Sequence, residues 1–195
     1  VVQQALAAET PSYHIVWDLE ELERVLVGAR AVGRMTLDTE TTDQAAMRAR
    51  LVGISLSLKP YEAYYIPVGH TPDAAERPQP DMAAVLARLR PVLEDPSIAK
   101  FGHNTKYDMV VLANHDVRVR GVTFDTMIAA YLLGESSLSL KALAFDRLGV
   151  EMTPITDLIG TGKRQVPMSM VPVSACAQYA CADADIAGRL QGGLE

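Results

Sequence analysis

Apolar residues recur along the chain with two different periods, and the change of period separates predicted strands from predicted helices. After Asp18, apolar residues return every three or four positions, which predicts a helix over residues 19–30. Strands are predicted at residues 34–38, 51–58 and 63–68, and the second of them alternates apolar with small or polar residues most clearly. Because only short connections join the three strands, we expect an antiparallel meander.

Most of the remaining chain is predicted to be helical. The expected elements are helices at residues 82–93, 105–114, 125–133, 138–148 and 173–190, and a short strand at residues 98–102. The order predicts an α/β fold with a mixed central sheet (a βββαβα core) flanked by helices. Open sheets of this kind place their sites at the carboxyl ends of strands, so we look for candidate chemistry there.

Composition and charge limit the domain number and the kind of partner. The 195 residues, 49% of them hydrophobic, suit one domain, and we expect a lead-in at residues 1–12 and a single domain at 13–195. Cys176 and Cys181 point in different directions on a predicted helix, which favours two free thiols and a reducing, cytoplasmic setting.

Neither a membrane nor a broad nucleic-acid-binding face is expected. The longest uncharged run, residues 165–182, contains two prolines, which a membrane-spanning helix would not accommodate. The net charge of −6 argues against a broad basic face for duplex DNA. A small acidic pocket that meets nucleic acid through metal ions remains compatible with this charge.

Two acids end the first of the three predicted strands. Asp38 and Glu40 are two positions apart, so their side chains project from the same face. Two carboxylates 4 Å apart repel each other by about 4 kcal/mol at an effective dielectric constant near 20, unless a cation lies between them. Mg²⁺ and Mn²⁺ prefer such oxygen ligands. A second Asp-x-Glu, Asp18 to Glu20, begins a predicted helix, where acids simply complement the helix dipole.

Two further motifs carry acids on predicted helices. Asp108 lies in the first turn of one helix, a position that the helix dipole also favours. Tyr179 and Asp183, four positions apart, share one face of the last helix. The neighbours of these two residues are small, so this helix could approach another element closely. Each motif alone is compatible with a purely structural role.

The order of the motifs is more specific than any one of them. Asp-x-Glu closes a strand, Asn-x-x-x-Asp opens a helix after another strand, and Tyr-x-x-x-Asp lies on a late helix. This arrangement resembles the tyrosine-containing branch of the DnaQ-like 3′–5′ exonucleases. Residues 51–55, 63–68, 121–131 and 160–163 are similar to the proofreading domain of bacterial DNA polymerase I. The resemblance begins near Tyr13 and implies that a polymerase domain is attached in the full-length protein.

The resemblance implies a ribonuclease H-like fold and two divalent cations, Mg²⁺ or Mn²⁺, with Zn²⁺ as an alternative at one position. Asp38, Glu40 and Asp183 would hold the first ion, Asp38 and Asp108 would hold the second, and Tyr179 would orient the attacking water. The implied substrate is the 3′ end of single-stranded or frayed DNA, the product is a nucleoside 5′-monophosphate, and the protein is expected to be a monomer. No lysine is expected beside the acids.

Substrate-binding residues are expected around these acids. They are Thr39, Thr41, Gln44, His103, Asn104, Ile155, Lys163 and Arg164. Gln44 and Ile155 stand where relatives often place side chains that separate the last bases, so we expect weak single-strand binding. Lys163 and Arg164, in a glycine-rich loop, are candidates for contacts with the DNA backbone. His103 is expected to form a neutral polar contact rather than to bind metal.

Two other functions remain open. A ribonuclease D-like exoribonuclease would share the five acid and tyrosine positions, and only a comparison of RNA with DNA separates it from a DNA exonuclease. A catalytically silent domain that supports a polymerase is the other alternative, and it would bind no divalent cation.

Overall fold

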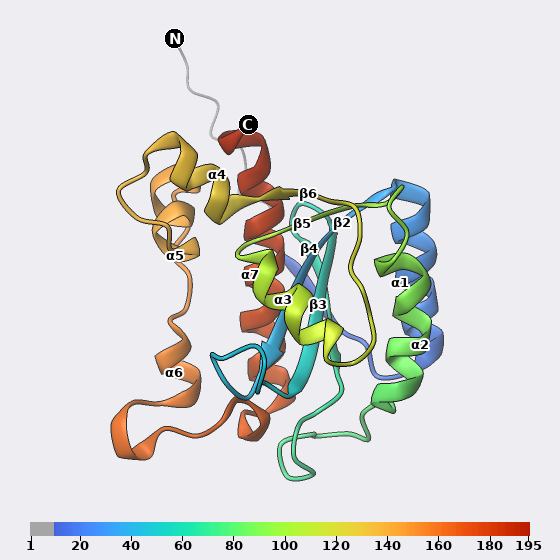
Figure 1. Ribbon diagram of the computed structural model, residues 1–195. Coiled ribbons are helices and arrows are strands. Elements are labelled where there is room, and N and C mark those ends of the chain that lie inside the picture. The colour runs from blue at the N-terminus through green and yellow to red at the C-terminus, as the bar shows by residue number, and fades with distance from the viewer. Residues whose placement is uncertain (1–9) are drawn as a thin grey trace.

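The strands of the computed structural model, which describes residues 10–195, form one mixed sheet in the order β1-β4-β3-β2-β5-β6 (Figure 1). The strands are β1 (Ser12–Ile15), β2 (Arg34–Thr41), β3 (Leu51–Lys59), β4 (Glu62–Pro67), β5 (Ala99–Gly102) and β6 (Val122–Asp125). Strands β2, β3 and β4 pair in antiparallel fashion, which confirms the predicted meander. The other pairs, β1 with β4, β2 with β5 and β5 with β6, are parallel.

Helices connect and cover these strands. They are α1 (Leu19–Val32), α2 (Met82–Leu93), α3 (Thr105–Ala113), α4 (Thr126–Leu133), α5 (Leu140–Leu143), α6 (Ile155–Ile159) and α7 (Val173–Leu194). A π-helical turn, η1 (Ala144–Leu148), continues α5, and two 3₁₀ turns, η2 (Gly162–Arg164) and η3 (Met168–Met170), precede α7. Among the helices of residues 10–195, none is both long enough and apolar enough to cross a bilayer.

Helix α1 shows how the second Asp-x-Glu is used. The Asp18 carboxylate accepts hydrogen bonds from the backbone N–H groups of Glu20 and Glu21, at 2.9 and 2.8 Å. In return, Glu21 accepts one from the backbone N–H of Trp17 at 2.8 Å. Gly33, with φ of 70°, ends the helix in the left-handed conformation that glycine adopts without strain. These acids therefore have a structural role at the start of the helix, as predicted, because they accept hydrogen bonds from its backbone N–H groups.

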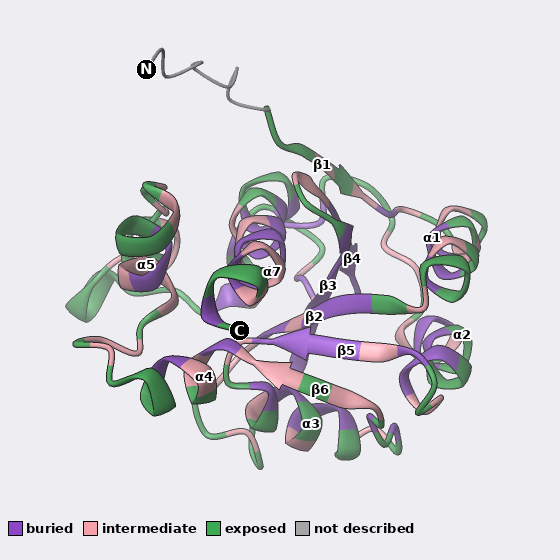
Figure 2. Cartoon of the chain, turned by 90° about the horizontal axis from the view of Figure 1, so that it is seen from above, coloured by how far each residue is buried: buried purple, intermediate pink, exposed green. Residues whose placement is uncertain are grey.

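The sheet separates two apolar layers. On one face, α1, α2 and α3 pack on buried side chains that include Leu26, Leu37, Ile54, Leu89 and Val111. On the other, α7 packs on Val52, Ala63 and Tyr65 through Cys176, Ala177, Ala180 and Cys181. Figure 2 shows α7 and α3 on opposite sides of β2 and β5. Since neighbouring side chains on a strand point to opposite faces, β2 sends Leu37 and Thr39 toward α3 and sends Asp38 and Glu40 toward α7.

Helix α7 lies close against the sheet because of its small residues. A Cβ added to Gly188 would meet Thr36 Oγ1 of β2 at 2.6 Å, so only glycine fits there. Asp185, fully buried, accepts hydrogen bonds from the Tyr13 hydroxyl at 3.1 Å and from the backbone N–H of Tyr61 at 2.7 Å. These contacts join α7 to β1 and to the turn between β3 and β4, which fixes the position of the helix along the sheet.

The fold class predicted from the sequence, a mixed α/β sheet flanked by helices, is confirmed, and four local predictions need correction. Strand β6 precedes the helix predicted at residues 125–133, and α6 was not predicted. The helix predicted at residues 138–148 consists of α5 and a π-helical turn. Residues 1–9 of the predicted lead-in lie outside the described residues, but Ser12, its last residue, already begins β1.

Candidate active site

Three of the four predicted acids meet on the face of the sheet that α7 covers. Asp38 and Glu40 of β2 and Asp183 of α7 each offer a carboxylate oxygen, and these oxygens all lie within 4.8 Å of one another. Glu40 is 7% exposed, whereas Asp38 and Asp183 are half-buried. Three acids this close, with a path to solvent, form a set of hard oxygen donors that suits a divalent cation.

Asp108, the fourth acid, reaches the site from the other side of β2. Strand β5 pairs with β2 only as far as Thr36, so the edge of β2 beyond that residue is open. There the Asp108 carboxylate accepts hydrogen bonds from the backbone N–H of Thr39 at 3.0 Å and from its hydroxyl at 2.6 Å. Asp108 is 2% exposed. Thr39, predicted to bind substrate, therefore holds a carboxylate in place.

Burial and mutual repulsion raise the pKa of every acid in the cluster. Burial raises the pKa of Asp38 to about 6, against the opposing hydrogen bond from Ser55. Burial and the charge of Asp38 raise the pKa of Asp183 to about 8. For Glu40 and Asp108, burial and then the charge of Asp38 raise the pKa well above its ordinary value. A cation among these acids would reverse this effect, because it favours their charged forms.

Tyr179 lies one turn before Asp183 on the same face of α7. Burial, followed by the negative charges of Asp183, Glu40 and Asp38, raises the pKa of its hydroxyl, so Tyr179 stays protonated. A protonated phenol beside the acids donates a hydrogen bond and does not serve as a base. The structure thus brings all five predicted catalytic residues to one region, three within a tight cluster and two beside it.

Three cavities adjoin the acids, and two of them are lined by predicted substrate-binding residues. The larger, about 620 Å³, runs past Glu40 and is lined by Thr39, Thr41, Gln44, Asn104 and Ile155, together with residues of α6 and the segment before η3. The smaller, about 350 Å³, is lined by Asp38, Asp183, Tyr179, His103, Lys141, Ser139, Leu140 and Ile155. Ile155, 40% exposed, lines both and so lies between them.

The predicted substrate-binding residues are not all placed alike. Six of the eight line one or both of these cavities, but Lys163 and Arg164 are exposed in η2 and line neither. His103 shares a hydrogen bond between its Nδ1 and the Thr126 hydroxyl at 2.8 Å, and burial lowers its pKa, so the ring is neutral at pH 7. His103 is not part of the group of Asp38, Glu40 and Asp183, whose oxygens lie within 4.8 Å of one another.

Two residues near the acids were not found from the sequence. Ser55 of β3, opposite Asp38 in the strand register, points its hydroxyl at the Asp38 carboxylate at 3.5 Å. The ammonium group of Lys141 in α5 lies 5.7 Å from the centre of the Tyr179 ring, contrary to the expectation of no lysine beside the acids. The strand register could have indicated Ser55, but nothing in the sequence places α5 against α7.

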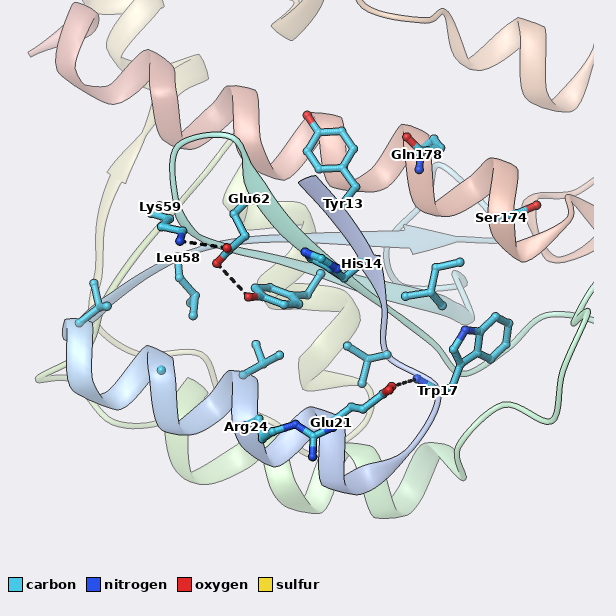
Figure 3. A pocket seen from close by; sticks show the side chains of 16 residues that line it. Tyr13, His14, Trp17, Glu21, Arg24, Leu58, Lys59, Glu62, Ser174 and Gln178 are labelled. Carbon is cyan, nitrogen blue, oxygen red and sulfur yellow. Dashed lines mark hydrogen bonds and ion pairs between the residues drawn. The ribbon is translucent and has the colours of Figure 1, made fainter. Parts of the chain in front are cut away.

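A larger cavity, about 760 Å³, lies elsewhere, between β1, β4 and α1 (Figure 3). None of the four acids lines it. Some of its polar groups pair with each other: Lys59 pairs with Glu62 at 3.0 Å, and Glu62 accepts a hydrogen bond from the Tyr64 hydroxyl at 2.8 Å. Cavity volume alone therefore does not identify the candidate active site, whereas the cluster of acids does.

Comparison with known proteins agrees with this geometry. A family model described as 3′–5′ exonuclease matches residues 13–195. DNA polymerase I of Chloroflexus aurantiacus is 40% identical over 96% of this chain, and that of Pseudomonas aeruginosa is 35% identical over 96%. The matched regions make up 20% and 21% of those relatives, so the chain spans about a fifth of their length.

Solved structures share the fold. Escherichia coli RNase D, described as an exoribonuclease, has a TM-score of 0.68 at 20% identity and covers 94% of this chain and 44% of its own. Brucella melitensis NrnC with bound Mg²⁺ has a TM-score of 0.63 at 24% identity, covering 95% of this chain and 80% of its own. The polymerase domain structure of Pol1 from M. smegmatis, in complex with DNA primer-template, has a TM-score of 0.64 at 25% identity, covering 93% of this chain and 27% of its own. The ribonuclease H-like fold, the clustered acids and the match over residues 13–195 together show that the chain belongs to the 3′–5′ exonuclease domain family of DNA polymerase I.

Proposed function

We propose that this domain removes nucleotides from the 3′ end of single-stranded or frayed DNA as the proofreading part of a DNA polymerase I. The observation that supports this most directly is the convergence of Asp38, Glu40 and Asp183 within 4.8 Å, with Asp108 held beside them by Thr39. The relatives that match at 35–40% identity are DNA polymerases, which favours DNA over RNA as the substrate.

Four acids suit two divalent cations, Mg²⁺ or Mn²⁺, with Zn²⁺ as an alternative at one position. Asp38, Glu40 and Asp183 would hold one ion, and Asp38 and Asp108 would hold the other. Such ions supply a water of lowered pKa and neutralise the charge on the attacking and leaving oxygens of the phosphodiester.

The protein's own groups then have separate tasks. The acids fix where the phosphodiester lies relative to β2. The protonated Tyr179 hydroxyl donates a hydrogen bond that orients the attacking water for in-line approach to phosphorus. Attack forms a P–O bond to that water and breaks the bond to the 3′ oxygen of the preceding nucleotide, which releases a nucleoside 5′-monophosphate. The α6 side of the larger cavity, with Ile155, would separate the last bases.

Frayed ends are the expected substrate because a strand must enter the cavities unpaired. A mismatch lowers the cost of unpairing, so selectivity for errors follows without any reading of base identity. In the full-length protein, a covalently attached polymerase domain would supply such ends. A bacterial cytoplasmic location is part of this proposal, because the relatives are bacterial DNA polymerases.

The chain itself contains a matched test, because it has two Asp-x-Glu motifs. Glu40→Gln should abolish release of nucleotides from a 5′-labelled DNA oligonucleotide in Mg²⁺ or Mn²⁺, and Asp38→Ala should do the same. Glu20→Gln, the same change in the exposed motif of α1, should leave the rate unchanged. Full activity of Glu40→Gln or Asp38→Ala would refute the proposed site.

The two alternatives predict different results in the same assay. Faster degradation of RNA than of DNA of the same sequence would favour a ribonuclease D-like activity, which the fold shared with RNase D keeps open. Absence of Mn²⁺ or Mg²⁺ binding at millimolar concentration, measured by calorimetry, would favour a silent structural domain.

A further inference from the structure

We propose that Lys141 is the phosphate-binding residue of this site and that its ammonium group contacts the phosphate of the 3′-terminal nucleotide. This inference rests on the DNA substrate proposed above. The positions first expected to contact phosphate, Lys163 and Arg164, line neither cavity beside the acids, whereas Lys141 lines the smaller one.

The position of Lys141 is fixed by its neighbours on two elements. It projects from α5 toward α7, where its ammonium group lies 5.7 Å from the centre of the Tyr179 ring. It is close enough to Asp183 for its charge to oppose the rise in the pKa of that carboxyl that burial causes. Lys141 is half-buried and lines the cavity that Asp38 also lines, and a lysine in such a position can cover its stem while its charge stays accessible.

The negative charges of the acids and of the DNA strand favour a positive residue such as Lys141 at this site. A DNA strand brings negative phosphates next to four carboxylates, which repel them wherever neither a cation nor a basic side chain lies between. Among the described residues, no other lysine or arginine lines the cavities beside the acids. A lysine ammonium has three donors and binds phosphate as a compact point charge. Lys141 is therefore placed to offset the repulsion on the side of the cluster that faces Tyr179.

Lys141 is also free for this contact. It forms no ion pair at or below 4.0 Å with any carboxylate of residues 10–195. The alternative role is purely structural, in which the ammonium group only packs over the Tyr179 ring. The two roles differ in one measurable property, because only a phosphate contact contributes to the salt dependence of DNA binding.

The test compares binding of a labelled single-stranded oligonucleotide by fluorescence anisotropy at several salt concentrations. Ca²⁺ replaces Mg²⁺, and a gel confirms that the strand stays intact. Lys141→Met should weaken binding about tenfold at low salt. It should also reduce the slope of log K against log salt by about 0.7, the value for one phosphate contact on a single strand. Lys141→Arg should keep most of the slope.

Lys59→Met is the matched control, because it removes the same charge from an exposed ion pair far from the acids. It should bind like the unchanged protein. A folded Lys141→Met protein with an unchanged slope would overturn the proposal and leave Lys141 as packing for Tyr179. If the Met variant does not fold, Lys141→Gln is judged by the same criterion. Failure of the unchanged protein to bind DNA would instead overturn the proposed function, and this inference with it.

Discussion

Asp38, Glu40 and Asp183 hold three like charges closer together than their electrostatics favour in the absence of a cation. The folded-state pKa of Asp183, about 8, lies above its ordinary 3.8, and that of Asp38 is about 6. A group with a raised folded pKa stabilises the fold fully below its unfolded pKa, and this stability is lost as the pH rises through the folded pKa. At the residue scale, the acids therefore work against folding at neutral pH.

The metal-free protein should accordingly become less stable between about pH 4 and pH 8, as measured by urea denaturation in a chelator. Mn²⁺ should restore stability, and more strongly at pH 8 than at pH 5, because deprotonated acids bind it better. His70, whose pKa burial lowers, acts in the opposite direction, so Asp183→Asn serves as the control and should flatten the decline. Metal-free stability that rises from pH 5 to pH 8 would contradict this account.

Removal of the Tyr179 hydroxyl tests whether that group contributes to the rate of nucleotide release separately from the acids. Tyr179→Phe should slow nucleotide release about 10–100-fold, the loss typical of a residue that orients a metal-bound group. Stabilisation by Mn²⁺ should be retained, because the acids are unchanged. Tyr131→Phe, at a tyrosine that is 70% exposed on α4, should have no effect on the rate. An unchanged single-turnover rate for Tyr179→Phe would remove its proposed role.

Sequence spacing predicted some of these residues and not others. Asp38 with Glu40, and Tyr179 with Asp183, share a face by strand or helix periodicity alone. Ser55 and Lys141 lie beside them only because of the β2–β3 register and the packing of α5 against α7. Such contacts depend on tertiary structure, which local spacing does not contain.

At the scale of elements, α7 carries two of the five catalytic candidates, and its contact with β2 depends on Gly188. Gly188→Ala would place a Cβ 2.6 Å from Thr36 Oγ1, so the buried Thr36 side chain, the helix or the strand must shift. We expect a loss of about 1–3 kcal/mol in the free energy of unfolding, as for other overpacked sites. Nucleotide release should slow as well, because the shift separates Asp183 from Asp38.

The same helix supplies the control. Gly192 has nothing within 4 Å of an added Cβ, so Gly192→Ala removes backbone freedom without a clash. It should raise the free energy of unfolding by up to about 1 kcal/mol and leave activity unchanged. Urea denaturation of both variants measures the difference. Equal stability of the two variants would show that α7 tolerates a wider separation from the sheet.

Long elements were predicted from the sequence, whereas several short ones were not, although the four-residue strand β5 was. Helix α2 begins and ends at the predicted residues, and α1, α3 and α7 differ by a few residues at their ends. Strands β1 and β6 have four residues each, too few for alternation to stand out. The π-helical turn Ala144–Leu148 was predicted as ordinary helix, because apolar spacing does not distinguish the two over five residues.

For the whole molecule, the order of elements was sufficient to predict the fold class, but not the strand order. The parallel pairing of β1 with β4 joins residues 12–15 to residues 62–65, a contact between distant parts of the sequence that no local pattern reports. Likewise, Asp38 and Asp183 are separated by most of the chain, and only the folded sheet shows that they meet.

The net charge and the lining of the larger cavity predict weak binding of DNA. The chain carries a net charge of −6, and Gln44 and Ile155, which line the larger cavity, offer no aromatic ring on which a base could stack. Each missing stacked base costs about 1–3 kcal/mol of binding. We therefore expect the isolated chain to bind a short single strand with a Kd above about 1 μM. A tighter Kd in an anisotropy titration at physiological salt would show that other contacts compensate.

Asp183 and Tyr179 lie on α7, which follows every other described element in chain order. Until that helix has been made and has docked on the sheet, the nascent chain holds only part of its acidic cluster. If the proposed function holds, a domain in which α7 has not yet docked would be unable to degrade nucleic acid. A truncated product that lacks α7 would be similarly harmless, because no fragment retains the full set of acids.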